Sequence, residues 1–89
     1  MQIQEIFLKA SEFYGENGFF DLEDKEFEFL LNRIINLNNK KILSSREIKE
    51  AKGMFAIFLY SDKEICLKNL NLNKRMEALL KKVLFEFCG

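Results

Sequence analysis

Apolar side chains recur every three or four residues along most of this 89-residue chain. That spacing places them on one face of a helix, whereas a half-buried strand would alternate apolar and polar residues. The first such segment runs from Ile3 to Tyr14 and ends at the glycines of residues 15–18. A second helix is expected to begin after an N-cap at Asp21 and to continue to about Leu37. Its predicted inward residues are Phe27, Leu30, Leu31, Ile34 and Ile35.

Three capping signals divide the second half of the chain. Ser44 is followed by Glu47 and Ser61 by Glu64, the spacing of a capping box, and Asn73 precedes the last apolar run. They predict a third helix after Ser44, a short fourth helix over Ser61–Lys68 and a last helix from Asn73 to about Phe87. The expected inward residues are Ile48, Ala51, Phe55, Phe58, Leu59, Ile65, Leu70, Met76, Leu79, Leu80, Val83, Leu84 and Phe87.

One segment has an alternative interpretation. Met54–Tyr60 and Ile65–Leu70 could instead form a hairpin around Ser61-Asp62. The helix is preferred because its apolar stripe already begins at Ile48 and has a cap. The predicted fold is therefore all-α: one domain over residues 1–89, a compact bundle of about five helices. Residues 1–42 form an acidic helical pair, and residues 43–89 form a basic part.

The net charge of zero conceals an uneven distribution. Residues 1–39 contain three basic and eight acidic residues, a net charge of −5. Residues 40–89 contain eleven basic and six acidic residues, a net charge of +5. Such a split indicates nucleic-acid contact on the basic side, or an attraction between the two halves within one fold. The charge pattern alone favours neither interpretation.

The sequence offers little for catalysis or for binding a cofactor. It has no histidine, and its four glycines are scattered instead of forming a phosphate-binding loop. The acids between Asp21 and Glu28 are typical of a solvated helix start. Cys66 and Cys88 are expected to be reduced thiols, with Cys66 buried, and two distant cysteines do not make a zinc site. We expect a protein that is not an enzyme and has no metal or cofactor.

Hydropathy and length bear on location and assembly. The longest apolar run, Met54–Tyr60, is far shorter than the roughly 18 residues that a membrane span needs. The N-terminal residues lack the basic region of a signal peptide, so a cytoplasmic protein without membrane contact is expected. A chain this short buries a modest core, which favours a homodimer or a protein partner. The abundance of Lys, Asn, Ile and Phe indicates a low-GC bacterium or its phage.

The most informative arrangement is a short helix, a turn over residues 69–72 and a basic amphipathic helix. On the last helix, the residues expected to point outward are Lys74, Arg75, Ala78, Lys81 and Lys82. In a DNA-binding helix-turn-helix, the second helix enters the major groove with a polar or basic outer face. The alternative is an ordinary amphipathic helix whose basic face is solvated. Spacing alone favours the ordinary amphipathic helix.

Two segments, LSSREIKEA (residues 43–51) and YSDKEICLKNLNLNKRMEALLKKVLFEF (residues 60–87), resemble the LuxR/GerE type of helix-turn-helix. The C-terminal DNA-binding region of sigma factors is similar. The matched positions are Leu43, Ser44, Arg46, Glu47, Ser61, Glu64, Ile65, Leu70, Leu72, Asn73, Val83, Leu84 and Phe87. The resemblance covers about half the chain, and the first 42 residues match no known pattern.

This resemblance implies a DNA-binding transcriptional regulator that uses the last helix as its recognition helix. The residues expected at double-stranded DNA are Ser44, Arg46, Asn73, Lys74, Arg75, Ala78, Lys81 and Lys82. Ser44 and Asn73 would cap helices near the DNA backbone, and the N-terminal helices would dimerise or bind a partner. The alternative is a small helical protein-interaction module without DNA binding, such as a phage or mobile-element inhibitor of a host protein.

Overall fold

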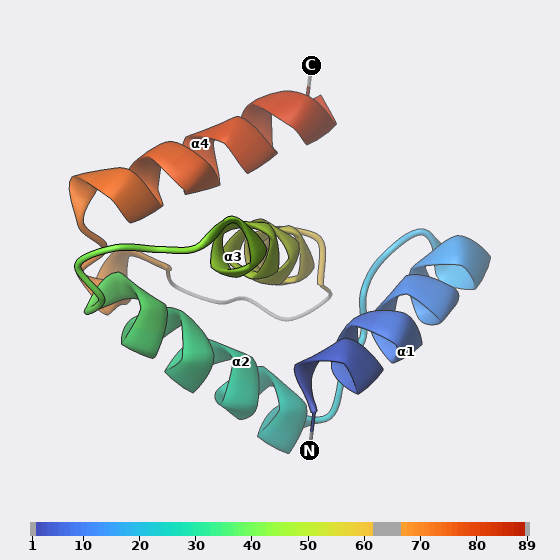
Figure 1. The fold of residues 1–89 in the computed structure, drawn as a ribbon. Coiled ribbons are helices and arrows are strands. Elements are labelled where there is room, and N and C mark those ends of the chain that lie inside the picture. The colour runs from blue at the N-terminus through green and yellow to red at the C-terminus, as the bar shows by residue number, and fades with distance from the viewer. Residues whose placement is uncertain (1, 62–66, 89) are drawn as a thin grey trace.

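The computed structural model describes residues 2–61 and 67–88 and contains four α-helices (Figure 1). They are α1 (Ile3–Asn17), α2 (Asp24–Asn38), α3 (Ser45–Leu59) and α4 (Lys74–Cys88). Within these described ranges no strand is formed, so the all-α prediction is confirmed. The expected five-helix bundle is not seen. Residues 62–66 of the predicted helix Ser61–Lys68 lie outside the described residues, and Leu67–Leu70 forms one 3-10 turn, η1.

Helix α3 is the centre of the core. It lies between α4 on one side and α2 on the other, with α1 to its right in the view of Figure 1. Its buried residues are Ala51, Met54, Phe55, Ala56, Ile57 and Phe58. So many buried positions on one helix require neighbours on several sides. Because α3 continues without a break to Leu59, the hairpin alternative for Met54–Tyr60 is wrong.

Helix α2 begins two residues later than its sequence predicted. The Glu26 carboxylate accepts a 2.9 Å hydrogen bond from the backbone N–H of Glu23, which makes Glu23 the N-cap in place of Asp21. The inward stripe of α2 also differs from the expected one, since Leu37 is fully buried and Ile35 is 39% exposed. Phe27, Leu30 and Ile34 are buried as predicted. Leu37 continues their spacing of three and four residues, whereas Ile35 lies beside that stripe.

Helix α1 extends to Asn17, three residues beyond its predicted end, and Gly18 then terminates it in the left-handed conformation at φ 79°. The helix packs on α3 at Gly53, where an added Cβ would lie 3.2 Å from the Phe7 ring. Gly53 therefore allows α1 to approach α3 closely. The chain after α1 is attached to the end of α3 by a 2.9 Å hydrogen bond from the Phe20 N–H to the Tyr60 carbonyl.

Ion pairs join each helix to its neighbour. The distances between the side-chain nitrogen and the carboxylate oxygen are 3.0 Å for Lys9 of α1 and Glu26 of α2, 3.0 Å for Arg33 of α2 and Glu50 of α3, and 3.6 Å for Lys52 of α3 and Glu86 of α4. In the part of the chain that the structure describes, no ion pair joins an acid of residues 1–39 to a base of residues 40–89. Among the described residues, the Arg33–Glu50 pair joins a base of the acidic half to an acid of the basic half, so it does not reduce the difference in charge between them.

The helices are all of moderate length and carry charged side chains. None of those described has the length and apolarity required to cross a lipid bilayer.

Candidate nucleic-acid interface

Helix α4 begins at a contact between two asparagines, Asn73 and Asn38. The side-chain oxygen of Asn73 accepts a 2.9 Å hydrogen bond from the N–H of Met76, so Asn73 caps α4 as its sequence predicted. The Asn73 side-chain amide also donates to the Asn38 carbonyl at 2.8 Å, and the Asn73 N–H donates to the Asn38 side-chain oxygen at 2.9 Å. The start of α4 is thereby attached to the end of α2.

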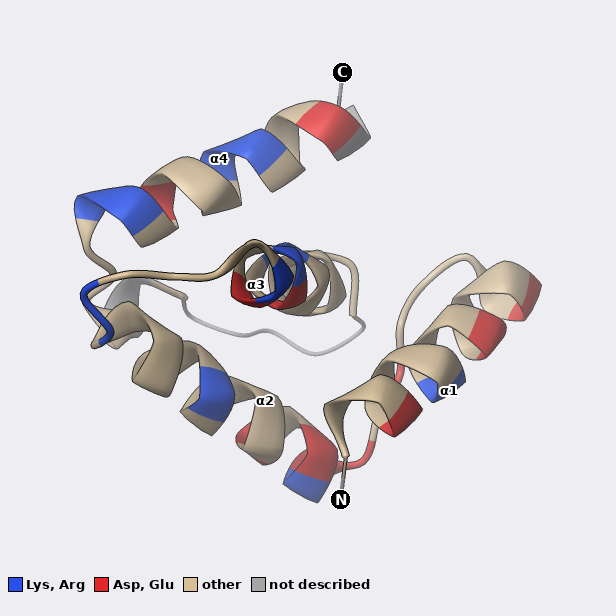
Figure 2. Ribbon diagram, viewed as in Figure 1, with Lys and Arg blue, Asp and Glu red and all other residues tan. Residues whose placement is uncertain are grey.

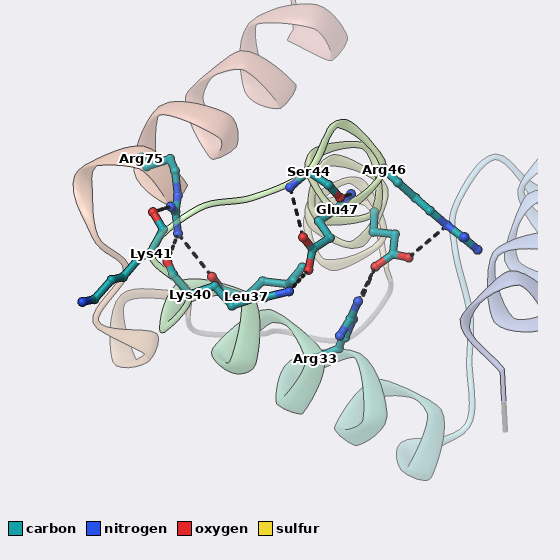
Figure 3. Close-up of polar contacts among 9 residues, drawn as sticks. Arg33, Leu37, Lys40, Lys41, Ser44, Arg46, Glu47 and Arg75 are labelled. Carbon is teal, nitrogen blue, oxygen red and sulfur yellow. Dashed lines mark hydrogen bonds and ion pairs between the residues drawn. The ribbon is translucent and has the colours of Figure 1, made fainter.

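Arg75 makes the second attachment between these helices. Its guanidinium donates hydrogen bonds to the carbonyls of Leu37, Lys40 and Lys41 at 3.3, 2.7 and 2.8 Å (Figure 3). The last carbonyls of a helix have no partner within the helix, and a basic side chain is a favourable partner for them. The prediction that Arg75 points outward is therefore wrong, because the Leu37 carbonyl of α2 and the Lys40 and Lys41 carbonyls of the following loop hold it partly buried.

The other residues predicted to point outward from α4 do so. Lys74, Ala78, Lys81 and Lys82 are exposed, while Met76, Leu79 and Val83 on the opposite face are buried. Figure 2 shows basic segments near the start of α4 and along its middle. Ala78 leaves the backbone accessible between the lysines. The result is an exposed face of α4 that carries three positive charges.

The same face contains an aromatic residue that the sequence analysis did not single out. Phe85 follows Lys81 and Lys82 along α4 and is 79% exposed. Leu84, which was expected to be buried, is 38% exposed, because the neighbouring Val83 takes the inward position. The side chain of Phe87 lies outside the described residues. We call Lys74, Ala78, Lys81, Lys82 and Phe85 the outer face of α4.

The start of α3 combines a capping box with an ion pair. Ser44 accepts a hydrogen bond from the Glu47 N–H at 3.2 Å, and the Glu47 carboxylate accepts one from the Ser44 N–H at 3.0 Å, which confirms the predicted capping box. The Lys40 ammonium also donates to the Glu47 carboxylate. The hydrogen bond from Lys40, followed by the one from the Ser44 backbone, lowers the pKa of Glu47 to about 2.

Arg46 lies apart from the outer face of α4. Its side chain points from α3 toward α1 and lies 4.0 Å from the Glu50 carboxylate (Figure 3). It lines a pocket of about 230 Å³ together with Ile3 and Phe7 of α1 and with Lys49 of α3. The structure therefore does not bring Arg46 together with Lys74, Lys81 and Lys82, although the sequence resemblance groups them.

Two residues near the start of α4 were not predicted to belong to this site. Asn38 was expected only to end α2, yet it holds Asn73. Lys41 gives its backbone carbonyl to Arg75 and points its ammonium away from the other labelled residues (Figure 3). The signal in the sequence is a run of asparagines and lysines after Leu37, whose partners lie more than thirty residues further along the chain. Local spacing does not reveal such contacts.

No group of three or more acidic, histidine or cysteine side chains among the described residues is placed to hold a metal ion. Comparison of the chain with protein-family models, curated proteins and solved structures found no match.

Proposed function

We propose that this protein binds double-stranded DNA through Lys74, Ala78, Lys81 and Lys82 on the outer face of α4. The observation that supports the proposal is the exposure of Lys74, Ala78, Lys81 and Lys82 on one side of a helix whose other side is buried. A helix that enters the major groove needs such a combination of a basic outer face and an apolar inner face. The resemblance of residues 43–87 to the LuxR/GerE type adds support for a transcriptional regulator.

The attachment of α4 to α2 serves this function. A binding surface is more precise when rigid elements of the fold hold it in place. The hydrogen bonds of Asn73 with Asn38, together with those from Arg75 to the loop after α2, hold the first turn of α4 at two points. In the proposed complex the first turn of α4 lies deepest in the major groove, because the first residues of a recognition helix contact the base edges.

The side chains have different roles in this proposal. Lys81 and Lys82, with Lys41 on the preceding loop, neutralise phosphates, because a lysine ammonium acts as a flexible point charge. Lys74 lies in the first turn, where it can contact bases or phosphates. Arg75 is a positioning residue, since its guanidinium is occupied by carbonyl oxygens of the protein.

Fluorescence anisotropy with a labelled random duplex at about 50 mM salt tests the proposal. We expect binding that weakens steeply as salt is added, because each neutralised phosphate releases counterions. The double change Lys81→Ala and Lys82→Ala should weaken binding to all sequences and lower the salt slope by roughly one unit per lost contact. Lys25→Ala is the matched control, since Lys25 lies on α2 and is paired with Glu23. Its binding should equal that of the wild type.

The absence of duplex binding by a folded wild-type protein would contradict the proposal. It would also favour the second candidate, a protein-interaction module such as an inhibitor of a host protein. The observation in favour of that candidate is Phe85, which is 79% exposed beside the 38% exposed Leu84, because aromatic side chains are enriched where proteins contact one another. Phe85→Ala then distinguishes the two: it should abolish binding to a protein partner and leave duplex binding within about twofold of the wild type.

A further inference from the structure

Helix α1 presents an acidic face to solvent. Glu5, Leu8, Glu12 and Glu16 are all exposed, and Leu8 is 63% exposed although it is apolar. Their spacing of three, four and four residues places them on one side of α1. Within the described residues these three carboxylates form no ion pair. We call these four residues the acidic face of α1, and Figure 2 shows the acidic segments along this helix.

The outer face of α4 is the complement of this surface. Its charge is mainly positive, because the three lysines outnumber the exposed Glu77 that lies between Lys74 and Lys81, and its exposed aromatic residue is Phe85. Lys74, Lys81 and Lys82 form no ion pair with any described residue. The two helices lie on different sides of α3 (Figure 1), so a contact between these faces requires two molecules.

One register of the two faces pairs an apolar and a charged residue of each helix. When the helices run antiparallel with Phe85 opposite Leu8, Lys81 lies opposite Glu12, because Lys81 comes four residues before Phe85 and Glu12 comes four residues after Leu8. Three residues beyond that pair, Ala78 lies opposite Gly15. Two small residues at this point allow the helix backbones to approach. The ion pair lies between these small residues and the apolar pair. Opposite charges across an interface attract the two partners and also fix their register.

We propose that the outer face of α4 binds the acidic face of α1 in a second copy of this chain, with the two helices antiparallel. The occupant is identified by charge complementarity and by the matched positions of the apolar residues. Self-association does not depend on DNA binding. Where the DNA-binding proposal also holds, the second copy covers the same lysines, so that self-association and duplex binding exclude one another.

Sedimentation equilibrium of the full chain tests this contact. We expect the average mass to rise with protein concentration at low salt and to return toward that of the monomer at high salt. Lys81→Glu should weaken self-association by roughly tenfold, because it places a carboxylate opposite Glu12. Glu12→Lys should have the same effect. The chain that carries both changes should recover the wild-type affinity, since the ion pair is restored with its charges exchanged.

Glu28→Lys is the control for net charge, because Glu28 is an exposed carboxylate of α2 outside the acidic face of α1. It should retain self-association, and circular dichroism should show that every variant is folded. A wild-type protein that stays monomeric at low salt overturns the proposal, and so does a double variant that fails to recover. Duplex binding measured on the same samples separates the two proposals: a monomer that binds DNA overturns only this one.

Discussion

The side-chain oxygen of Asn38 accepts a hydrogen bond from the Asn73 N–H, and the Asn38 carbonyl accepts another from the Asn73 side chain. Asn73 also caps α4. Asn73→Ala should therefore lower the free energy of unfolding by about 1–2 kcal/mol, of which roughly 1 kcal/mol is the loss of the cap. Urea unfolding followed by circular dichroism measures this change.

A double-mutant cycle separates the cap from the contact with Asn38. Asn38→Ala alone should cost about 0.5–1.5 kcal/mol, and it should cost less when Asn73 is already alanine. Strictly additive effects of the two changes would mean that the contact between α2 and α4 contributes nothing to stability.

Arg75 and Lys74 are neighbours in sequence with opposite surroundings. Arg75→Ala should destabilise the protein by about 1–3 kcal/mol, because it removes the hydrogen bonds that the guanidinium donates to the Leu37 carbonyl of α2 and to the Lys40 and Lys41 carbonyls of the following loop. Lys74→Ala should change stability by less than about 0.5 kcal/mol, because Lys74 is exposed. Thermal unfolding of the two variants in the same buffer compares them directly. Equal melting temperatures would contradict the positioning role of Arg75.

Stability should fall as the solution is acidified, and Glu47 should contribute to that fall. Its pKa is lowered from 4.5 to about 2 in the folded protein by the hydrogen bond from Lys40 and those at the Ser44 cap. A carboxylate with a lowered folded-state pKa stabilises the protein above its unfolded pKa, and this contribution is lost as pH falls through the folded pKa. The loss attributable to Glu47 should therefore lie between about pH 4.5 and 2.

Glu47→Gln tests this assignment, because glutamine retains a side-chain acceptor for the Ser44 N–H but does not titrate. Its stability should depend less on pH in that window than the wild type does, as measured by urea unfolding at a series of pH values. Glu28→Gln, which removes an exposed carboxylate of α2, should keep the wild-type dependence. An unchanged profile for Glu47→Gln would show that other carboxylates control the acid transition.

Gly53 lies inside α3, where alanine would be favoured by roughly 1 kcal/mol on helix propensity. The added methyl group would, however, lie 3.2 Å from the Phe7 ring of α1 and would have to displace it. Gly53→Ala should therefore gain less than about 1 kcal/mol in the wild type and should recover the full gain when Phe7 is alanine. Equal gains in both backgrounds, measured by urea unfolding, would show that the ring gives way freely.

The accuracy of the sequence-based predictions follows the range of the interactions involved. The caps at Ser44 and Asn73 and the course of α3 depend on residues three or four positions apart, and these predictions are confirmed. Ile35 was misplaced because both it and Leu37 are apolar, and only the position of the neighbouring helices decides which one is buried. Arg75 was misplaced because its partners are carbonyl groups about 35 residues away, which no side-chain pattern marks.

The separation of charge has a physical consequence for how this molecule approaches other molecules. A chain with a net charge of −5 on residues 1–39 and +5 on residues 40–89 has almost no net attraction to a distant polyanion, but it has a dipole moment. Near such a surface it experiences a torque that turns the basic half forward. Because ions screen the field beyond about 10 Å at 0.1 M salt, this turning is confined to the last ångströms of the approach. The molecule is therefore oriented at close range without being drawn in from far away.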